Sequence, residues 1–476
     1  MLDKKNFYIN GKWVSPKNSK EIEVIDPSTE KSCAVISLGD ANDVNAAVNA
    51  AKNAFDSWSF TTKEKKIELL EKLYAVYKKR WAEIADAITL EMGAPKDFSS
   101  QLQTGTGASH IKSFTRYLKE FNFEKVLGDH AKNQKILYEP KGVCALITPW
   151  NWPMNQVCLK VIPALAAGCT MILKPSKEAP LSAFILADIL DEIGLPAGVF
   201  NLVSGHGSEI GNYMSSHPDV DMVSFTGSTG AGVSVSQSAA PTIKRVTLEL
   251  GGKSANVALD DSDPILVAKK AIGACHQNSG QTCSALTRLI IPEEMNEQIC
   301  EIIAAKNDSY LVGNPLDETT RCGPMVSSRQ QSSVTEYIQS GINEGATLIS
   351  GGLGVPDGVD KGFYVKPTIF ANVTPNMRIW KEEIFGPVLV ITTYKNESEA
   401  LSLANDSIYG LSGGVWSASN ERAIEFAKKM RTGQVSINGG AFNVSAPFGG
   451  YKLSGNGREL GTHGLDEFLE IKSIQM

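Results

Sequence analysis

The chain has 476 residues, a formal net charge of −6, 42% hydrophobic residues and 21% charged residues. This composition is that of an ordinary globular protein, which excludes disorder, collagen and coiled coil as descriptions of the whole chain. The mildly acidic balance excludes electrostatic attraction to nucleic acid or to an anionic membrane, and no apolar run predicts a transmembrane helix. The polar start of the chain does not resemble a secretory signal, so we expect a cytoplasmic protein.

The amino-terminal part contains one long predicted helix. Apolar residues recur at helical spacing from Thr61 to Gly93, and Thr61 and Glu64 have the spacing of a capping box. Gly93 and Pro95 supply the stop signal. The alternating polarity of residues 119–140 predicts a hairpin.

From Gly142 onward, short apolar strands alternate with helical runs. Strands are predicted at 143–148, 170–173, 199–203, 222–225 and 246–250, with an apolar stretch around 159–167 and a helix at 181–193. This alternation predicts βαβ units and a doubly wound α/β domain with a parallel sheet. Ligands bind beyond the carboxyl ends of the strands in such sheets, where Pro149, Lys174, Gly205, Thr226 and Gly251 stand.

A second α/β region is predicted to begin near Gly252. Its helices are expected at 268–274, 293–306, 329–345 and 400–405, with a strand at 388–394. The tail, Leu469 to Ile474, has the pattern of a strand but no evident partner nearby in the sequence. Length and pattern together predict two or three domains.

The eight cysteines are predicted to be reduced thiols. A chain of this length builds its own core, and it has no Cys-x-x-Cys pair and no histidine at metal-ligand spacing from a cysteine pair. We therefore predict no disulfide and no metal site. Cys158 and Cys169 lie in apolar surroundings that indicate core positions, whereas Cys283 stands among glycine and small polar residues that indicate an accessible loop. A nucleophilic cysteine needs a lowered pKa or a neighbouring base, and packing is the alternative.

Two polar residues at predicted strand ends are further candidates. Glu249 is a charge at the end of an apolar strand, where carboxylates are rare without a role; its alternative is a structural salt bridge. Asn151 follows a buried strand and stands between Pro149 and Pro153. An amide fixed there either donates to an oxyanion or satisfies a turn.

Two glycine patterns resemble nucleotide motifs. Gly252-Lys253-Ser254 lacks the first glycine of a P-loop, because that position is Thr247. The glycines at 227, 230 and 232 lack the spacing of the dinucleotide fingerprint. Gly227 nevertheless follows a strand and precedes a predicted helix, a context suited to phosphate binding or to a tight turn alone.

Seven motifs together are far more specific than any one of them. They are Pro149-Trp150-Asn151-Trp152-Pro153; Lys174-Pro175-Ser176; Phe225-Thr226-Gly227-Ser228 with Gly232; Leu248-Glu249-Leu250-Gly251-Gly252-Lys253; Gly280-Gln281-Thr282-Cys283; Glu383-Ile384-Phe385-Gly386-Pro387; and Pro447-Phe448-Gly449-Gly450 with Lys452, Ser454-Gly455 and Gly457-Arg458-Glu459. In this order they resemble the aldehyde dehydrogenase superfamily over essentially the whole chain.

The resemblance implies a fold and an assembly. It implies a Rossmann-like dinucleotide-binding domain at 1–118 and 141–251 and an α/β catalytic domain at 252–467. A small β oligomerisation element would comprise 119–140 and 468–476, as expected of a homodimer or homotetramer. The substrate would be a small-molecule aldehyde and the cofactor NAD or NADP.

The resemblance also implies catalytic roles. Cys283 would attack the aldehyde, and the Asn151 amide and the Cys283 backbone N–H would stabilise the oxyanion. After hydride transfer to the nicotinamide, Glu249 would activate the water that hydrolyses the thioester. Glu459 and Lys160 match positions linked to proton relay, with a structural ion pair as the alternative.

Cofactor and substrate residues follow in the same way. The cofactor-binding residues implied are Trp150, Lys174, Lys177, Gly207, Gly227, Ser228, Gly232, Glu383 and Phe385. Lys174 would bind the adenosine ribose, Glu383 the nicotinamide ribose and Ser228 the pyrophosphate, with Gly207 near the adenine. The helix after Asn151 would line the substrate tunnel and expose Trp152, Gln156 and Leu159.

One departure from the family concerns cofactor choice. Lys177 stands where many members have a glutamate that binds the ribose 2′-hydroxyl. A glutamate repels a 2′-phosphate and a lysine attracts it, so we predict that NADP is accepted. The alternative is that Lys177 points to solvent.

Substrate class and reaction type leave alternatives. A neutral aliphatic or aromatic aldehyde is expected: Leu159 replaces a tryptophan common in betaine aldehyde enzymes, and no arginine adjoins Cys283, although Arg288 is close in sequence. A CoA-acylating semialdehyde dehydrogenase characteristically lacks the water-activating glutamate, so Glu249 favours hydrolysis. A non-catalytic relative would have little need for Cys283, Glu249 and Asn151 together.

Overall fold

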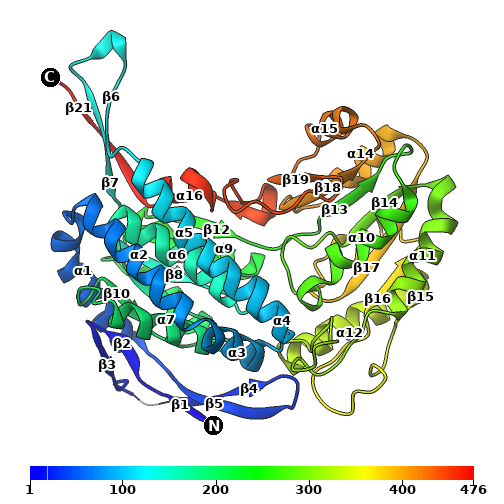
Figure 1. Ribbon diagram of the computed structural model, residues 1–476, viewed down its shortest axis with the longest axis horizontal. Helices are drawn as coiled ribbons and strands as arrows, with labels where there is room; N and C mark the ends of the chain where they lie inside the picture. Colours follow the sequence, from blue (N-terminus) through cyan, green and yellow to red (C-terminus); the bar gives the residue numbers. More distant parts are fainter. Residues whose placement is uncertain (19) are drawn as a thin grey trace.

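The computed structural model describes residues 1–18 and 20–476. Two α/β lobes stand side by side, and a narrow β arm projects from the first lobe and carries the C-terminus (Figure 1). The described residues include no helix that is both long enough and apolar enough to span a bilayer.

The first lobe is built on an eight-stranded sheet. Its strands, in sheet order, are β20 (Gly455–Asn456), β12 (Arg245–Glu249), β11 (Met222–Thr226), β8 (Val143–Ile147), β9 (Thr170–Lys174), β10 (Phe200–Leu202), β2 (Phe7–Ile9) and β3 (Lys12–Val14). The five strands from β12 to β10 are parallel. From β8 the chain continues to β9 and β10 on one side, and then crosses to β11 on the other side of β8. The carboxyl ends of β8 and β11 therefore meet at a topological switch point.

Helices cover this sheet on both faces. They are α1 (Ala41–Ser59), α2 (Lys63–Lys79), α3 (Trp81–Met92), α5 (Gly105–Glu120), α6 (Pro153–Ala167), α7 (Leu181–Glu192), α8 (Asn212–Ser216) and α9 (Thr229–Ala239). β8 is buried along its whole length, as its continuous apolar sequence predicts. α6 ends at Gly168, which adopts the left-handed conformation that glycine tolerates.

The single helix predicted from Thr61 to Gly93 is wrong in two respects. The segment forms two helices, α2 and α3, that meet at Arg80, whose backbone is non-helical. The cap of α2 is Thr62, whose side chain accepts from the Lys65 N–H, and not the Thr61–Glu64 box. Both helices bury a face in the same lobe, so the helical spacing of apolar residues continues across Arg80. A non-helical conformation at a single residue does not interrupt that spacing.

The second lobe is built on a seven-stranded sheet. In sheet order its strands are β15 (Thr347–Ser350), β16 (Thr368–Ala371), β17 (Val388–Tyr394), β14 (Arg288–Pro292), β13 (Ala255–Ala258), β18 (Ser412–Trp416) and β19 (Gln434–Ile437). Its helices are α10 (Pro264–His276), α11 (Asn296–Asp308), α12 (Ser328–Asn343), α13 (Arg378–Lys381), α14 (Glu397–Asn405) and α15 (Asn420–Ala427).

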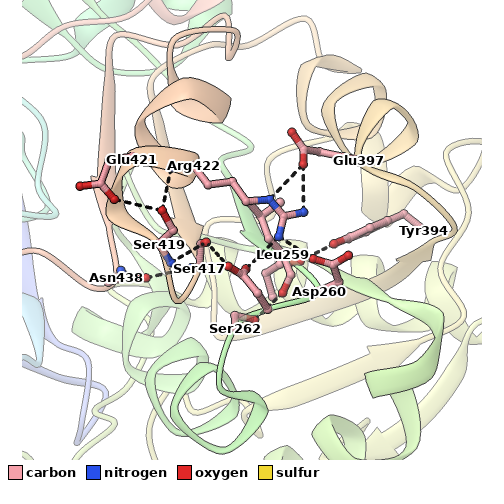
Figure 2. Close-up of polar contacts among 12 residues, drawn as sticks. Leu259, Asp260, Ser262, Tyr394, Glu397, Ser417, Ser419, Glu421, Arg422 and Asn438 are labelled. Carbon is pink, nitrogen blue, oxygen red and sulfur yellow. Dashed lines mark hydrogen bonds and ion pairs between the residues drawn. The ribbon is translucent and has the colours of Figure 1, made fainter.

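An ion cluster closes the carboxyl ends of β13 and β18. Arg422 contacts Asp260 at 2.6 Å, Asp261 at 3.2 Å and Glu397 at 3.0 Å, and so links α14 and α15 to the loop after β13 (Figure 2). Cys283 precedes β14 and therefore lies at the opposite end of the strands. The carboxyl ends of β13 and β18 therefore hold this ion cluster and not the Cys283 loop.

The chain returns to the first lobe before residue 467, contrary to the predicted domain boundary. β20 pairs with β12, and Phe448, Leu460 and Leu465 pack in the core of the first lobe. α16 (Gly461–Asp466) packs against α5 and α6. A crossing of this kind depends on long-range packing, so no local sequence pattern marks it.

The tail strand has no partner near it in the sequence, as expected, and pairs instead with a strand of the 119–140 segment. β21 (Leu469–Ile474) pairs antiparallel with β7 (Lys135–Pro140), and β6 (Glu124–Val126) completes the sheet. The order β21-β7-β6 leaves the outer edge of β21 unpaired among the described residues. A separate sheet joins β1 (Leu2–Lys4), β5 (Lys31–Leu38) and β4 (Lys20–Asp26).

Candidate active site

A cavity of about 430 Å³ brings together eight of the predicted site residues. Residues of both lobes line it, including Trp150, Asn151, Gly227, Ser228, Glu249, Cys283, Glu383 and Phe385. The first lobe contributes the loops after β8, β11 and β12, and the second contributes the loops before β14 and β17. Residues that are distant in sequence therefore converge on one site.

The Cys283 loop is held in an unusual backbone conformation. Asn278, Ser279 and Gly280 have φ values of 56°, 56° and 72°, so three consecutive residues are left-handed. At Gly280 a Cβ would lie 2.1 Å from the Gly386 carbonyl oxygen, so only glycine fits. Gln281 anchors the loop, since its Oε1 accepts from the Val326 N–H at 3.0 Å.

Cys283 is half-buried, and its pKa is raised. Burial contributes most, followed by the negative charges of Glu383 and Glu249. The thiol is therefore protonated at neutral pH in this structure. Of the two requirements stated above, a lowered pKa is not met, and the carboxylates of Glu383 and Glu249 are the charged groups closest in effect to the thiol.

Asn151 is immobilised from three sides. Its Nδ2 donates to the Gln281 carbonyl at 3.0 Å, two residues before Cys283. Its own carbonyl accepts from Gln103 Nε2 at 3.0 Å and from Asn278 Nδ2 at 2.8 Å. An amide NH₂ carries two hydrogens, so one N–H remains to meet an oxyanion in the cavity.

Glu249 is a buried carboxylate without a partner. Neither of its oxygens bonds any residue that the structure describes, which does not support the salt-bridge alternative. Burial and the nearby charge of Glu459 raise its pKa well above the usual carboxyl range. A Cβ on Gly449 would lie 2.7 Å from Glu249 Oε1, so that glycine leaves room for the carboxylate. These features are typical of a proton acceptor in catalysis.

Lys160 and Glu459 form a buried ion pair beside Glu249. Lys160 Nζ lies 2.7 Å from Glu459 Oε1 and 3.0 Å from Ser224 Oγ. The other Glu459 oxygen bonds none of the described residues. The charge of Glu459 raises the pKa of Glu249, and the charge of Lys160 lowers it. The geometry fits both a proton relay to Glu249 and a structural ion pair.

The N-terminus of α9 faces the cavity through Gly227 and Ser228. Ser228 caps the helix, since its Oγ accepts from the Ala231 N–H at 3.4 Å, and its hydroxyl hydrogen remains free to donate. A Cβ on Gly232 would lie 2.6 Å from Leu250, so this glycine permits α9 to approach the end of β12. Thr226 also lines the cavity, and its buried Oγ1 bonds no described residue.

Aromatic and acidic residues from the second lobe complete the cavity. The Trp150 and Phe385 rings meet edge to face at 5.4 Å. Phe385 has a φ of 57°, and its carbonyl accepts from Gln330 Nε2 at 2.9 Å. Glu383 Oε1 accepts from the Gly252 N–H at 2.9 Å, and burial raises the pKa of Glu383 to about 7.

Four predicted cofactor residues do not line this cavity: Lys174, Lys177, Gly207 and Gly232. Lys174 is buried, which together with the charge of Lys177 lowers its pKa to about 8. Lys177 Nζ pairs with Glu178 Oε1 at 2.6 Å, and Glu178 does line the cavity. Lys177 is thus paired with a residue that lines the cavity, while its own side chain stays 32% exposed.

A second cavity, of about 770 Å³, is lined in part by Asn278 of the Cys283 loop. Phe98 and Asn278 are among its lining residues, and Phe98 meets Trp152 edge to face at 5.2 Å. Trp152 is half-buried, and its Nε1 donates to Thr282 Oγ1 at 3.0 Å, next to Cys283.

The predicted exposure of α6 toward the substrate is corrected at two positions. Gln156 and Leu159 are each 4% exposed and line neither cavity. The buried Arg288 guanidinium donates to the carbonyls of Lys253, Leu403, Ala404 and Asp406. Arg288 is therefore not available to hold a substrate carboxylate.

Sequence reasoning missed the residues that position Asn151 and Phe385. Gln103 lies in a π-helical turn (Ser99–Thr104), Asn278 in the left-handed kink and Gln330 in α12. None stands in a motif. The one available signal was the presence of amides in otherwise buried segments, where polar groups need partners.

Comparison with known proteins agrees with the geometry. The model of the aldehyde dehydrogenase family matches residues 13–474. A 3-succinoylsemialdehyde-pyridine dehydrogenase from a Pseudomonas species is 50% identical over 475 residues, which cover 100% of this chain and 99% of the relative.

Solved structures agree as well. An aldehyde dehydrogenase from Bartonella henselae is 47% identical with a TM-score of 0.98, over 100% of this chain and 99% of that one. Aldehyde dehydrogenase C from Pseudomonas syringae, a cysteine-to-alanine mutant in complex with NAD⁺ and octanal, is 45% identical with a TM-score of 0.97, over 99% of this chain and 96% of that one. This chain therefore belongs to the aldehyde dehydrogenase family, whose members oxidise aldehydes to carboxylic acids with a nicotinamide cofactor.

Proposed function

We propose that this chain performs hydrolytic aldehyde oxidation with Cys283 as nucleophile and Glu249 as general base. The observation that carries the proposal is that Glu249, a buried carboxylate without a partner among the described residues, shares a cavity with Cys283 and Asn151. A CoA-acylating enzyme has no use for a base that activates water, so Glu249 favours hydrolysis.

The residues present fit a nicotinamide dinucleotide. The N-terminus of α9 lines the cavity, and helix N-termini bind phosphate groups. The unpartnered Thr226 hydroxyl and the carboxyl of Glu383 are available to further polar groups of the cofactor. When bound, the nicotinamide supplies the acceptor for the hydride of the aldehyde carbon.

The reaction then follows from the chain's own groups. The Cys283 thiol gives up its proton to solvent, and its sulfur forms a bond to the aldehyde carbon. The free N–H of Asn151 and the Cys283 backbone N–H stabilise the oxyanion, each by about 3–4 kcal/mol. After oxidation a thioester joins the carbonyl to Cys283. Glu249 takes a proton from water, the hydroxide displaces the sulfur, and the acid leaves.

Product analysis tests this proposal. With octanal and NAD⁺ we expect octanoate and NADH in equal amounts, at a rate that added CoA does not change. Mass spectrometry of the products and the absorbance of NADH provide the measurement. Formation of octanoyl-CoA with a CoA-stimulated rate would assign the chain to the acylating class instead.

For the cofactor, we propose that NADP is accepted alongside NAD. Lys177 is held beside the cavity by Glu178, where its charge is available to a 2′-phosphate. We expect Lys177→Glu to lower the ratio of kcat/KM for NADP to that for NAD by about tenfold or more, because a charge-assisted hydrogen bond contributes about 1.5–3 kcal/mol. Glu178→Gln, which frees Lys177, should raise the ratio. Negligible use of NADP by the wild-type enzyme would contradict the idea.

The substrate is proposed to be a neutral aliphatic or aromatic aldehyde. The commitment of Arg288 to backbone carbonyls supports this class over substrates with a distal carboxylate. The names of two relatives support the same class: one is a 3-succinoylsemialdehyde-pyridine dehydrogenase, and the other was solved in complex with octanal.

Assembly into a homodimer or homotetramer is proposed to use the arm. The outer edge of β21 is unpaired among the described residues, and Ile471 on this strand is 69% exposed. Unpaired edges favour pairing with another chain. A chain that ends at Glu470 should therefore sediment as a smaller species than the full chain in analytical ultracentrifugation, and an unchanged mass would contradict the role of the arm. A cytoplasmic location also remains a prediction, supported by eight free cysteines.

A further inference from the structure

A third cavity, also of about 430 Å³, lies at the root of the arm. The end of α1 and the start of α2 form one wall, and Phe123, Tyr138 and Pro140 of the arm segment form another. Most of the lining residues are apolar or aromatic, and Phe60 among them is 87% exposed. None of them lines either of the two cavities described above. Cavities of this size, with apolar walls and few polar groups, are typical of small-molecule sites.

Lys66 supplies a buried amine to this cavity. The residue lies in the first turns of α2, lines the cavity and is only 5% exposed. Its Nζ lies 5.8 Å from the centroid of the Phe123 ring, and a Cβ on Gly168 would lie 2.6 Å from it. The Nζ forms no hydrogen bond or ion pair with any residue that the structure describes. The amine is therefore placed between the arm segment and the end of α6 without a polar partner.

This amine carries a charge at neutral pH. Burial lowers the pKa of Lys66 to about 8, so most of the protein retains the proton at neutral pH. The neighbouring group that raises this pKa is the Cys169 thiol, and no carboxylate contributes. A buried charge is unfavourable unless it is paired. The C-terminal end of α6, beside Gly168, favours a cation, and a bound anion would complete the pairing.

The other charged residues of the cavity leave this positive site open. Lys63 donates to two backbone carbonyls, and Glu139 pairs with Lys472 at 2.7 Å. Asp56 is the remaining carboxylate of the lining, and no ion pair joins it to Lys66. The first residues of α2 also line the cavity, and the N-terminus of a helix favours an anion. The amine and the helix end therefore favour an anionic head group, and the aromatic walls favour an apolar tail.

We propose that this cavity binds an apolar monocarboxylate, with its carboxylate at Lys66 Nζ and its tail against the aromatic walls. A singly charged head group suits a site with one unpaired amine, because Asp56 and Glu139 on the same walls repel a second negative charge. The acid formed from an aliphatic aldehyde belongs to this class of ligand. The inference goes beyond the proposed function and does not depend on it, since the site shares no residue with the active-site cavity.

Calorimetric titration of the full-length protein with octanoate tests the proposal. We expect the wild type to bind octanoate, and Lys66→Met to raise Kd by about tenfold or more, because it removes the charge at similar length. Lys65→Met is the matched control: Lys65 is exposed and precedes Lys66 on the same helix, so its loss should leave Kd unchanged. Lys66→Arg, which keeps the charge, should retain binding.

Ligand analogues separate the two parts of the site. Octanol has the tail without the charge and acetate the charge without the tail, so each should bind about tenfold more weakly than octanoate, or less. If Lys66→Met fails to fold, Phe60→Asp replaces it, since this side chain is 87% exposed and contributes little to the core. Phe60→Asp removes part of the apolar wall and adds a negative charge, and should weaken octanoate binding by about threefold or more.

Binding at the active site is distinguished by its response to these variants. Octanoate held near Cys283 would bind Lys66→Met as tightly as the wild type, and equal affinities would overturn the proposal. Absence of octanoate binding to the wild type would overturn it too. If octanoate does not bind and Lys66→Met sediments as a smaller species, a second copy of the chain occupies the cavity instead. Failure to oxidise octanal would contradict the proposed function alone, because the titration does not depend on turnover.

Discussion

Cys283→Ala is expected to abolish aldehyde oxidation. Removing a nucleophile leaves only the oxyanion donors and substrate binding, so kcat should fall by a factor on the order of 10⁵–10⁶. The side chain lies in the cavity and bonds no helix or strand, so the fold should be retained. The measurement is NADH production with octanal, together with cofactor binding by fluorescence titration, which should be preserved.

A second cysteine provides the matched control. Cys300 is half-buried in α11, bonds Asn296 Oδ1 of the same helix at 3.4 Å and lines neither cavity near Cys283. Cys300→Ala should therefore oxidise octanal at the wild-type rate. Substantial turnover by Cys283→Ala would remove Cys283 from the mechanism, and an equal loss in both variants would indicate a general effect on folding.

Glu249→Gln should separate the two halves of the reaction. The amide has the shape of the carboxyl but cannot take a proton from water, so thioester hydrolysis should slow by about 10²–10⁴-fold. Attack and hydride transfer precede that step. Rapid mixing should then show a burst of about one NADH per active site followed by slow turnover. A fully linear time course at the wild-type rate would contradict the role of Glu249.

The same variant distinguishes catalysis from structure. Glu249 has no ion-pair partner among the described residues, and its buried charge is unfavourable, as its raised pKa indicates. Replacement by a neutral amide should therefore leave the free energy of urea unfolding unchanged or increase it. A loss of several kcal/mol would instead indicate a hidden structural role.

The pH dependence of kcat follows from the raised pKa of Glu249. The carboxyl must be ionised to accept a proton from water, so turnover should rise as the pH passes upward through its pKa. Because burial and Glu459 raise that pKa, the rise should lie above the range of ordinary carboxyl groups. At saturating cofactor, Glu249→Gln should lose this limb of the profile.

Local patterns were sufficient for the residues at strand ends. Asn151, Gly227 and Glu249 follow or end apolar strands, and a parallel sheet brings such ends to one edge. Cys283 was distinguishable from Cys158 by its small polar neighbours, and the structure places the first at the cavity and the second in the core.

Features that depend on long-range packing were beyond local patterns. β21 pairs with β7, a strand far earlier in the sequence, and β20 returns to the first sheet. The break at Arg80 has no glycine or proline to mark it.

The central claim is that an acyl group is carried on Cys283 and released with the help of Glu249. The most direct test is mass spectrometry of Glu249→Gln quenched during turnover of octanal and NAD⁺. The account predicts an octanoyl thioester on the peptide that contains Cys283, in an amount equal to the NADH burst. An NADH burst with no acyl adduct, or with the adduct on another residue, would contradict it.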